Sequence, residues 1–261
     1  MDIAGLRGEA LAMADAADEI ARRYFGGPVA ASAKPDGSPV TAADHEIETA
    51  LREWIARSLP GHAILGEEEG GALEAGRPTW VIDPIDGTKN FLRGVPVFGT
   101  LIALVVHDEV VVAVASAPAL DERWDAGTGL GTRRNGRPVR VSAIERLEDA
   151  HLQHGGLEFL RDDPVLWERL GELATDSWKT GGMGDFWMHM LVAGGMAEAA
   201  FEADLAIWDR AALVCLIEEA GGRATTWSGE GVLHGDGTIL SSNGLIHDAV
   251  RTRLTTSTRS R

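Results

Sequence analysis

Apolar residues near the start of the chain recur every three or four positions and predict an amphipathic helix over residues 3–24. A second helical pattern covers residues 42–58, where Pro60-Gly61 ends it, and the apolar run at 62–65 predicts a strand. At the start of this second helix, Thr41-Ala42-Ala43-Asp44 fits a capping box. The chain therefore opens with two helices and turns to β-structure.

The middle of the chain consists of apolar runs separated by turn residues. Trp80-Val81-Ile82 predicts a buried strand that ends at Pro84. Residues 99–106 and 110–117 predict an antiparallel hairpin, and Asn135-Gly136 predicts a second tight turn. These residues are typical of a β-sheet.

The β-rich character ends around residues 142–149, and helical patterns return. Residues 185–194 and 210–220 predict helices, and residues 197–203 predict a strand. We therefore predict a mixed α/β (α+β) protein with an N-terminal half, 1–145, and a C-terminal half, 146–261.

Composition narrows the possible functions. The 261 residues are 44% hydrophobic and carry a net charge of -16, which disfavours binding to nucleic acids or anionic membranes. Cys215 is the only cysteine, so neither an internal disulfide nor a cysteine zinc site can form. With no apolar stretch long enough to span a bilayer and no export signal, we expect a cytoplasmic protein without a membrane partner.

The segment Asp83-Pro84-Ile85-Asp86-Gly87-Thr88 carries the first candidate chemistry. Two carboxylates follow a buried strand and can face one point. Gly87 and Thr88 supply a permissive backbone and free N–H groups where a helix can begin, and such an N-terminus attracts anions. The segment predicts a cation site beside a phosphate site.

Further acids also end strand-like runs: Glu67 follows residues 63–65, and Asp209 follows residues 205–208. Unit charges about 4 Å apart repel by about 4 kcal/mol at an effective dielectric near 20, so a cluster of such acids calls for a cation. Oxygen ligands without histidine favour Mg²⁺, with Mn²⁺ as the alternative.

Each acid also has a structural interpretation. The Asp-Pro and Asp-Gly pairs are ordinary turn dipeptides, and Glu67 lies in an acidic turn. Asp209 can cap the helix predicted from residue 210, and Asp44 can serve its capping box. The joint occurrence of these acids, in this order, favours the metal site.

The order of these motifs resembles the inositol-monophosphatase-like superfamily of metal-dependent phosphatases. The matching segments are Pro39-Val40-Thr41-Ala42-Ala43-Asp44, Gly66-Glu67-Glu68, the residues from Trp80 to Thr88, and Ile207-Trp208-Asp209-Arg210-Ala211-Ala212. The resemblance spans nearly the whole chain and implies a layered αβαβα sandwich. It also makes a homodimer plausible.

By this resemblance, the metal ligands are Glu67, Asp83, Asp86, Asp209 and the main-chain carbonyl of Ile85. Gly87 and Thr88 would bind phosphate through backbone N–H groups. Glu67, and the Thr88 hydroxyl paired with Asp44, would orient a water molecule for in-line attack on phosphorus without a phosphoenzyme.

Four further segments, residues 89–97, 116–120, 184–186 and 242–248, resemble the histidinol-phosphate phosphatase branch. Histidinol phosphate carries an amine and an imidazole, so its pocket should offer carboxylates. Asp185 and Glu202 are our candidates for substrate binding. One position departs from the pattern: Gly181 stands where relatives often carry an arginine.

Three other interpretations remain open. The substrate can be inositol monophosphate or another sugar or nucleotide phosphate. Haloacid-dehalogenase phosphatases also place acids before Gly-Thr, with the first Asp as nucleophile, but their spacing is D-x-D rather than the D-x-x-D of Asp83 and Asp86. A non-catalytic protein that binds divalent ions is the third.

Overall fold

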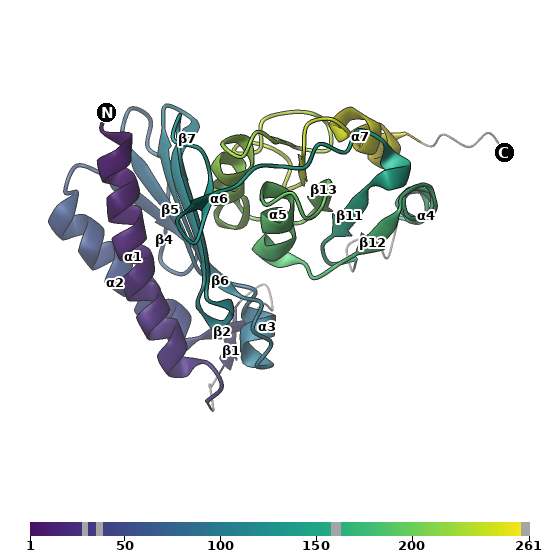
Figure 1. Cartoon of the computed structure of the whole chain (residues 1–261). Helices are drawn as coiled ribbons and strands as arrows, with labels where there is room; N and C mark the ends of the chain where they lie inside the picture. Colours follow the sequence, from purple (N-terminus) through teal and green to yellow (C-terminus); the bar gives the residue numbers. More distant parts are fainter. Residues whose placement is uncertain (28–30, 35–38, 158–162, 257–261) are drawn as a thin grey trace.

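The computed structural model describes residues 1–27, 31–34, 39–157 and 163–256 and arranges them in five layers of helices and sheets (Figure 1). The α-helices are α1 (Ile3–Tyr24), α2 (Ala42–Ser58), α3 (Thr88–Leu92), α4 (Pro164–Asp176), α5 (Asp185–Ala193), α6 (Ile207–Glu218) and α7 (His247–Thr255). Short 3-10 helices span Pro118–Leu120 and Leu147–Asp149. Among the described residues, no helix is long and apolar enough to cross a membrane.

An eight-stranded sheet has the order β10-β9-β8-β7-β6-β5-β3-β4. Its strands are β3 (Ala63–Gly66), β4 (Gly70–Gly71), β5 (Thr79–Asp86), β6 (Gly99–Val106), β7 (Glu109–Ala117), β8 (Glu122–Gly127), β9 (Arg133–Arg134) and β10 (Arg137–Pro138). Both predicted hairpins are confirmed, since β6 pairs with β7 and β9 with β10 in antiparallel register. Only the β3–β5 pair in this sheet is parallel among the described residues.

Side chains along the central strands alternate between the two faces of this sheet, apart from local irregularities such as Val111 and Val112 of β7, which belong to the same core. Trp80 and Ile82 of β5 point into a core formed with α1 and α2, whereas Val81 points into the core formed with α5 and α6. The same alternation continues along β6 and β7, as expected for strands buried on both faces. The sheet is therefore covered by helices on both sides.

A second sheet has the order β12-β11-β13-β15-β14. Its strands are β11 (His151–His154), β12 (Lys179–Gly181), β13 (Ala199–Glu202), β14 (Arg223–Thr225) and β15 (Ile239–Ser242). Helices α5 and α6 lie between the two sheets, and α4 and α7 cover the outer face (Figure 1). The predicted αβαβα sandwich is confirmed. A separate ribbon, β1 (Ala31–Ala33) with β2 (Pro39–Thr41), leads into α2.

The eight-stranded sheet uses residues 63–138 and the five-stranded sheet uses residues 151–242. One core cluster nevertheless draws side chains from both, including Val81 of β5 and Ala200 of β13. A division of the chain after residue 145 stays a prediction.

A polar network inside the second half depends on a neutral histidine. His247 is fully buried, and its Nδ1 and Nε2 lie 2.8 and 2.9 Å from the hydroxyls of Ser242 and Thr225. Thr225 donates to the carbonyl of Thr226, so Nε2 donates to Thr225, and Ser242 donates to Nδ1. Burial lowers the pKa of His247 to about 4.

We expect this network to lose stability in acid. A depressed folded-state pKa means that the unfolded chain binds the proton first, so stability is lost as the pH falls from about 6.5 towards 4. The free-energy difference between wild type and His247→Asn should shrink by about 3 kcal/mol between pH 7 and pH 4. Urea titrations across this range measure it. The exposed control His45→Asn should leave the profile unchanged, and a constant difference for His247→Asn would contradict the prediction.

Candidate active site

A β-bulge in β5 brings two carboxylates to the same side of the sheet. Asp83 pairs with Leu101 and Asp86 with Gly99, so three steps along β5 match two along β6. In a regular strand, residues three apart point to opposite faces. The prediction that Pro84 ends the strand is wrong, because β5 runs on to Asp86: the irregular register accommodates a residue without an N–H.

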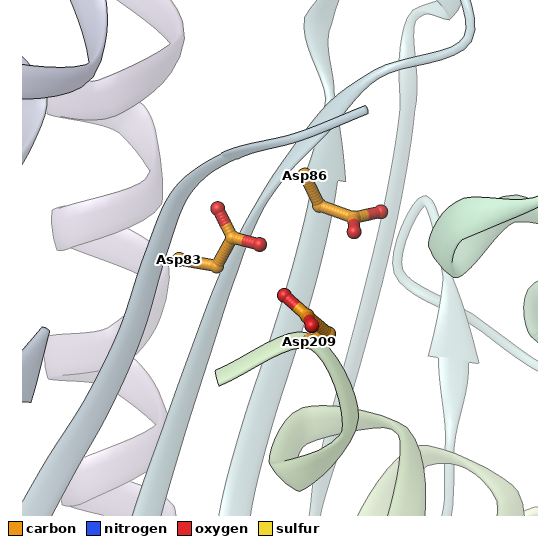
Figure 2. A group of neighbouring side chains, drawn as sticks. All are labelled: Asp83, Asp86 and Asp209. Atoms are coloured by element: carbon orange, nitrogen blue, oxygen red, sulfur yellow. The ribbon is translucent and has the colours of Figure 1, made fainter. Parts of the chain in front are cut away.

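Asp209 reaches the two carboxylates from α6, in the helix layer between the two sheets. The prediction of a helix starting at residue 210 is wrong: α6 begins at Ile207, and Asp209 is its third residue. Its Oδ2 accepts a hydrogen bond from the N–H of Ala206 at 2.7 Å, which satisfies a backbone donor at the helix start. Asp209 therefore stabilises the helix end and also projects towards Asp83 and Asp86 (Figure 2).

The three aspartates form a compact group of oxygens. One carboxylate oxygen of each of Asp83, Asp86 and Asp209 lies within 4.8 Å of the others. Asp83 is 2% exposed and Asp86 is 7% exposed, and the buried Oδ1 of Asp83 has no hydrogen-bond partner. An unpaired buried oxygen in an all-oxygen cluster fits a hard divalent cation.

Burial is the main cause of the raised pKa values of these three carboxyl groups. It raises the pKa values of Asp83 and Asp86 well above their ordinary range, and neighbouring carboxylates raise them further. It raises the pKa of Asp209 to about 7. Without a cation, the group therefore keeps protons to a higher pH than ordinary carboxyl groups do, because several adjacent negative charges in a buried site are costly.

Glu67 lies beside this group, and its charge adds to the raised pKa of Asp83. Glu67 Oε1 accepts a hydrogen bond from Lys34 Nζ at 2.6 Å, and the same ammonium donates to Glu68 Oε1 at 2.6 Å. Lys34 could not be predicted from the sequence, because its contact with Glu67 joins residues 33 positions apart and no local pattern indicates this contact. Its ammonium balances part of the negative charge next to the cluster.

The Gly-Thr turn leads from β5 into α3. Gly87 adopts a left-handed backbone, with φ 83°, at the N-cap of that helix. The expected pairing of Thr88 with Asp44 is not made, because Thr88 Oγ1 donates instead to the carbonyl of Ile85 at 3.0 Å. The capping box is confirmed: Asp44 Oδ2 accepts from the N–H and hydroxyl of Thr41, whereas the buried Oδ1 of Asp44 has no partner.

These groups surround one cavity of about 400 Å³. Every predicted site residue except Asp44 lines it: Glu67, Asp83, Ile85, Asp86, Gly87, Thr88, Asp185, Glu202 and Asp209. Lys89 and Asn90, which the sequence analysis did not single out, line it too. The cavity thus brings together segments from both halves of the chain.

Two acids occupy the side of the cavity contributed by α5 and β13. Glu202 is 8% exposed, and its Oε2 has no hydrogen-bond partner. Burial first, and the charge of Asp185 second, raise the pKa of Glu202 to about 8. Burial also raises the pKa of Asp185 to about 6, and Asp185 Oδ2 accepts from Asn90 Nδ2 at 3.1 Å. This side of the cavity suits a cation.

The space beside Gly181 is taken by another side chain. A Cβ atom at this position would lie 3.2 Å from Nε2 of the buried Gln153. An arginine here would need Gln153 to move. Gln153 of β11 therefore occupies the space next to this glycine.

Comparison with known proteins identifies the family. Residues 6–259 match the model of the inositol monophosphatase family. The chain is 43% identical to a histidinol-phosphatase of Mycobacterium tuberculosis over 94% of this chain and 96% of that protein. It is 36% identical to an inositol-1-monophosphatase of Rhizobium meliloti over 84% of each.

The fold agrees with this. The crystal structure of extragenic suppressor protein suhB from Bartonella henselae superposes with a TM-score of 0.90 at 28% identity, covering 97% of this chain and 99% of that one. The cluster of Asp83, Asp86 and Asp209 in the present chain is a site that can bind a metal, as expected for a metal-dependent phosphatase. The chain belongs to the inositol monophosphatase family and is a phosphatase, as its motifs predicted.

Proposed function

We propose that this phosphatase hydrolyses histidinol phosphate to histidinol and phosphate with Mg²⁺ as cofactor. The observation that carries the proposal is the pairing, in one cavity, of the aspartate cluster with the buried carboxyl of Glu202, whose Oε2 has no hydrogen-bond partner. The aspartate cluster suits a phosphate ester and its cation. The Glu202 carboxyl suits the positively charged alcohol that the reaction releases.

In the proposed site, Asp83, Asp86, Asp209, Glu67 and the Ile85 carbonyl hold divalent cations. Their oxygens match the preference of Mg²⁺, and the Ile85 carbonyl has a second lone pair besides the one that accepts from Thr88. Bound cations would activate a water molecule and offset the charge of the phosphate and the leaving oxygen. Mn²⁺ is the alternative ion.

The chain's own groups would orient the reactants. The N–H groups of Gly87 and Thr88, at the start of α3, would hold phosphate oxygens. The Glu67 carboxylate and the Thr88 hydroxyl would align the attacking water. Asp44 keeps an unpartnered buried oxygen, which is available to accept from Thr88 once that hydroxyl leaves Ile85.

The substrate assignment depends on charge. An amine that enters the cavity would find the carboxyl groups of Glu202, which accepts from the N–H of Gly156, and of Asp185, which accepts from the Asn90 amide. A neutral polyol such as inositol monophosphate, the second candidate, would leave the buried Glu202 carboxyl without an ionic partner. A location in the cytoplasm and assembly as a homodimer stay proposals.

Substitution of a cluster member tests the chemistry. Asp83→Asn should lower phosphatase activity by about 100-fold or more, because it removes an anionic oxygen from the proposed metal site. The fold should persist, since an amide has the size of the carboxyl group that it replaces and burial raises the pKa of that carboxyl, which favours a neutral group here. Initial rates in Mg²⁺ and circular dichroism measure both.

The matched control is Asp125→Asn, at a buried acid of β8 outside the cavity, which should keep its turnover. Wild-type turnover by Asp83→Asn would contradict the assignment. So would a covalent aspartyl-phosphate trapped on Asp83, which belongs to the haloacid-dehalogenase mechanism.

The raised pKa values predict how metal stabilises the protein. A carboxyl whose folded pKa is raised stabilises the fold at low pH and loses this contribution as the pH rises through that pKa, about 6 for Asp185 and about 7 for Asp209. Protons therefore compete with Mg²⁺ more strongly at pH 5 than at pH 8. The Mg²⁺-induced rise in Tm should therefore be small at pH 5 and about 5–10 °C at pH 8, with magnesium about 100-fold above its Kd.

Thermal melts in Mg²⁺ and in EDTA give this difference directly. In Asp209→Asn, the Mg²⁺-induced rise in Tm should depend less on pH, because the variant lacks one of the titrating ligands. Equal shifts at pH 5 and pH 8 for the wild type would count against the metal site.

The choice of substrate is tested by a pair of esters. We expect kcat/KM for histidinol phosphate to exceed that for inositol 1-phosphate, and Glu202→Gln to lower only the former, by about 10-fold or more. The second ester is the internal control, since a general loss of folding would lower both rates together. A clear preference for inositol 1-phosphate, or equal losses in the variant, would overturn the substrate assignment while leaving the phosphatase chemistry intact.

A further inference from the structure

One face of α2 is directed at the turn that carries Glu67. Asp44, Glu48 and Arg52 are spaced four apart and so lie on the same side of the helix. Asp44 belongs to the capping box already described. Glu48 is 0% exposed and does not line the cavity, so it is not itself placed to touch substrate or metal.

Glu48 uses both of its oxygens on the backbone that follows Glu67. Oε2 accepts from the N–H of Glu68 at 2.7 Å, and Oε1 accepts from the N–H of Glu69 at 3.0 Å. These are charge-assisted bonds, which are stronger than bonds between neutral groups. Two consecutive peptide units directly after Glu67 are thus held by one buried carboxylate.

Arg52 completes this arrangement. Its Nε donates to Glu48 Oε1 at 2.8 Å, and its Nη2 donates to the carbonyl of Gly70 at 2.6 Å. The guanidinium therefore neutralises Glu48 and also binds the far end of the same turn. A buried carboxylate with a paired cation and satisfied oxygens is far less costly than an isolated one.

The residue before Glu67 shows how close this approach is. A Cβ atom on Gly66 would collide with the Glu48 carboxylate, so a side chain there would displace that carboxylate from its present position. On the other side, the N–H of Glu67 donates to the carbonyl of Ile82 at 3.2 Å, next to Asp83 in β5. Glu67 is therefore held between the strand that carries Asp83 and the Glu48 carboxylate.

We propose that Glu48, supported by Arg52, is a positioning residue that sets the Glu67 carboxylate for the divalent cation shared with Asp83. This inference rests on the proposed function, in which Glu67 is a metal ligand. Because Glu48 acts only through the backbone of residues 68 and 69, its loss should weaken metal binding without removing a ligand.

The test is the affinity of the purified full chain for Mn²⁺ alone, measured by calorimetry without substrate. Glu48→Gln replaces one acceptor oxygen with an amide that cannot accept from a backbone N–H. We expect its Mn²⁺ affinity to fall by about 10-fold or more. The matched control is Asp18→Asn: Asp18 is a buried acid that accepts from Ser116 and Arg123, and its loss should lower Tm with Mn²⁺ affinity within about two-fold of wild type.

A double-mutant cycle separates positioning from general destabilisation. In a Glu67→Gln background, Glu48→Gln should change Mn²⁺ affinity by less than about two-fold, because the carboxylate that it positions is gone. Full additivity of the two losses would overturn the proposal. If Glu48→Gln does not fold, Arg52→Lys serves in its place, with an expected loss of about three-fold, and wild-type affinity in that variant overturns the proposal equally.

The outcomes also distinguish the two levels of inference. Unchanged Mn²⁺ affinity in Glu67→Gln would remove Glu67 from the proposed ligands and with it the proposed mechanism. Weaker binding in Glu67→Gln together with wild-type binding in Glu48→Gln would remove only the positioning role.

Discussion

The repulsion between carboxylates that the fold buries at one point constrains the rest of this structure. Asp83, Asp86 and Asp209 would separate in water, yet they approach within 4.8 Å because rigid elements present them. Specific donors make this tolerable: the N–H of Phe186 bonds to Asp86 at 2.7 Å, and the N–H of Ala206 bonds to Asp209 at 2.7 Å. Protons, or a divalent cation, supply the remaining compensation.

The same contacts join the layers of the sandwich. The Phe186 N–H belongs to α5, which packs between the two sheets, and Asp86 lies at the end of the first sheet. The residue before Phe186 is Asp185, which has a left-handed backbone with φ 55° and faces the other side of the cavity. The start of one helix thus supports the aspartate cluster and also supplies an acid to the opposite side of the cavity, so both sides share one rigid support.

Much of this could be read from the sequence, because the relevant signals are local. The helix over residues 3–24, the hairpin at 107–109 and the Thr41–Asp44 capping box follow from periodicity and turn chemistry. The site followed from the order of several short acidic motifs. The start of α6 and the course of β5 through Pro84 did not follow: α6 begins before Asp209, which accepts from the N–H of Ala206, and a bulge carries β5 past the proline. Lys34 carries no local sign, whereas Glu48 was detectable as the residue one turn beyond Asp44.

The irregular register of β5 also affects how many oxygens this strand can offer to a divalent cation. A plain D-x-D strand would direct two acids to one side and leave the intervening carbonyl in the ladder. The extra residue in Asp83-Pro84-Ile85-Asp86 frees main-chain oxygens from that ladder, and side-chain hydroxyls of Thr100 and Thr88 bind those of Pro84 and Ile85 instead. The strand can thereby offer a cation a third, neutral oxygen, which adds a ligand to an overcrowded anionic group without adding to its charge.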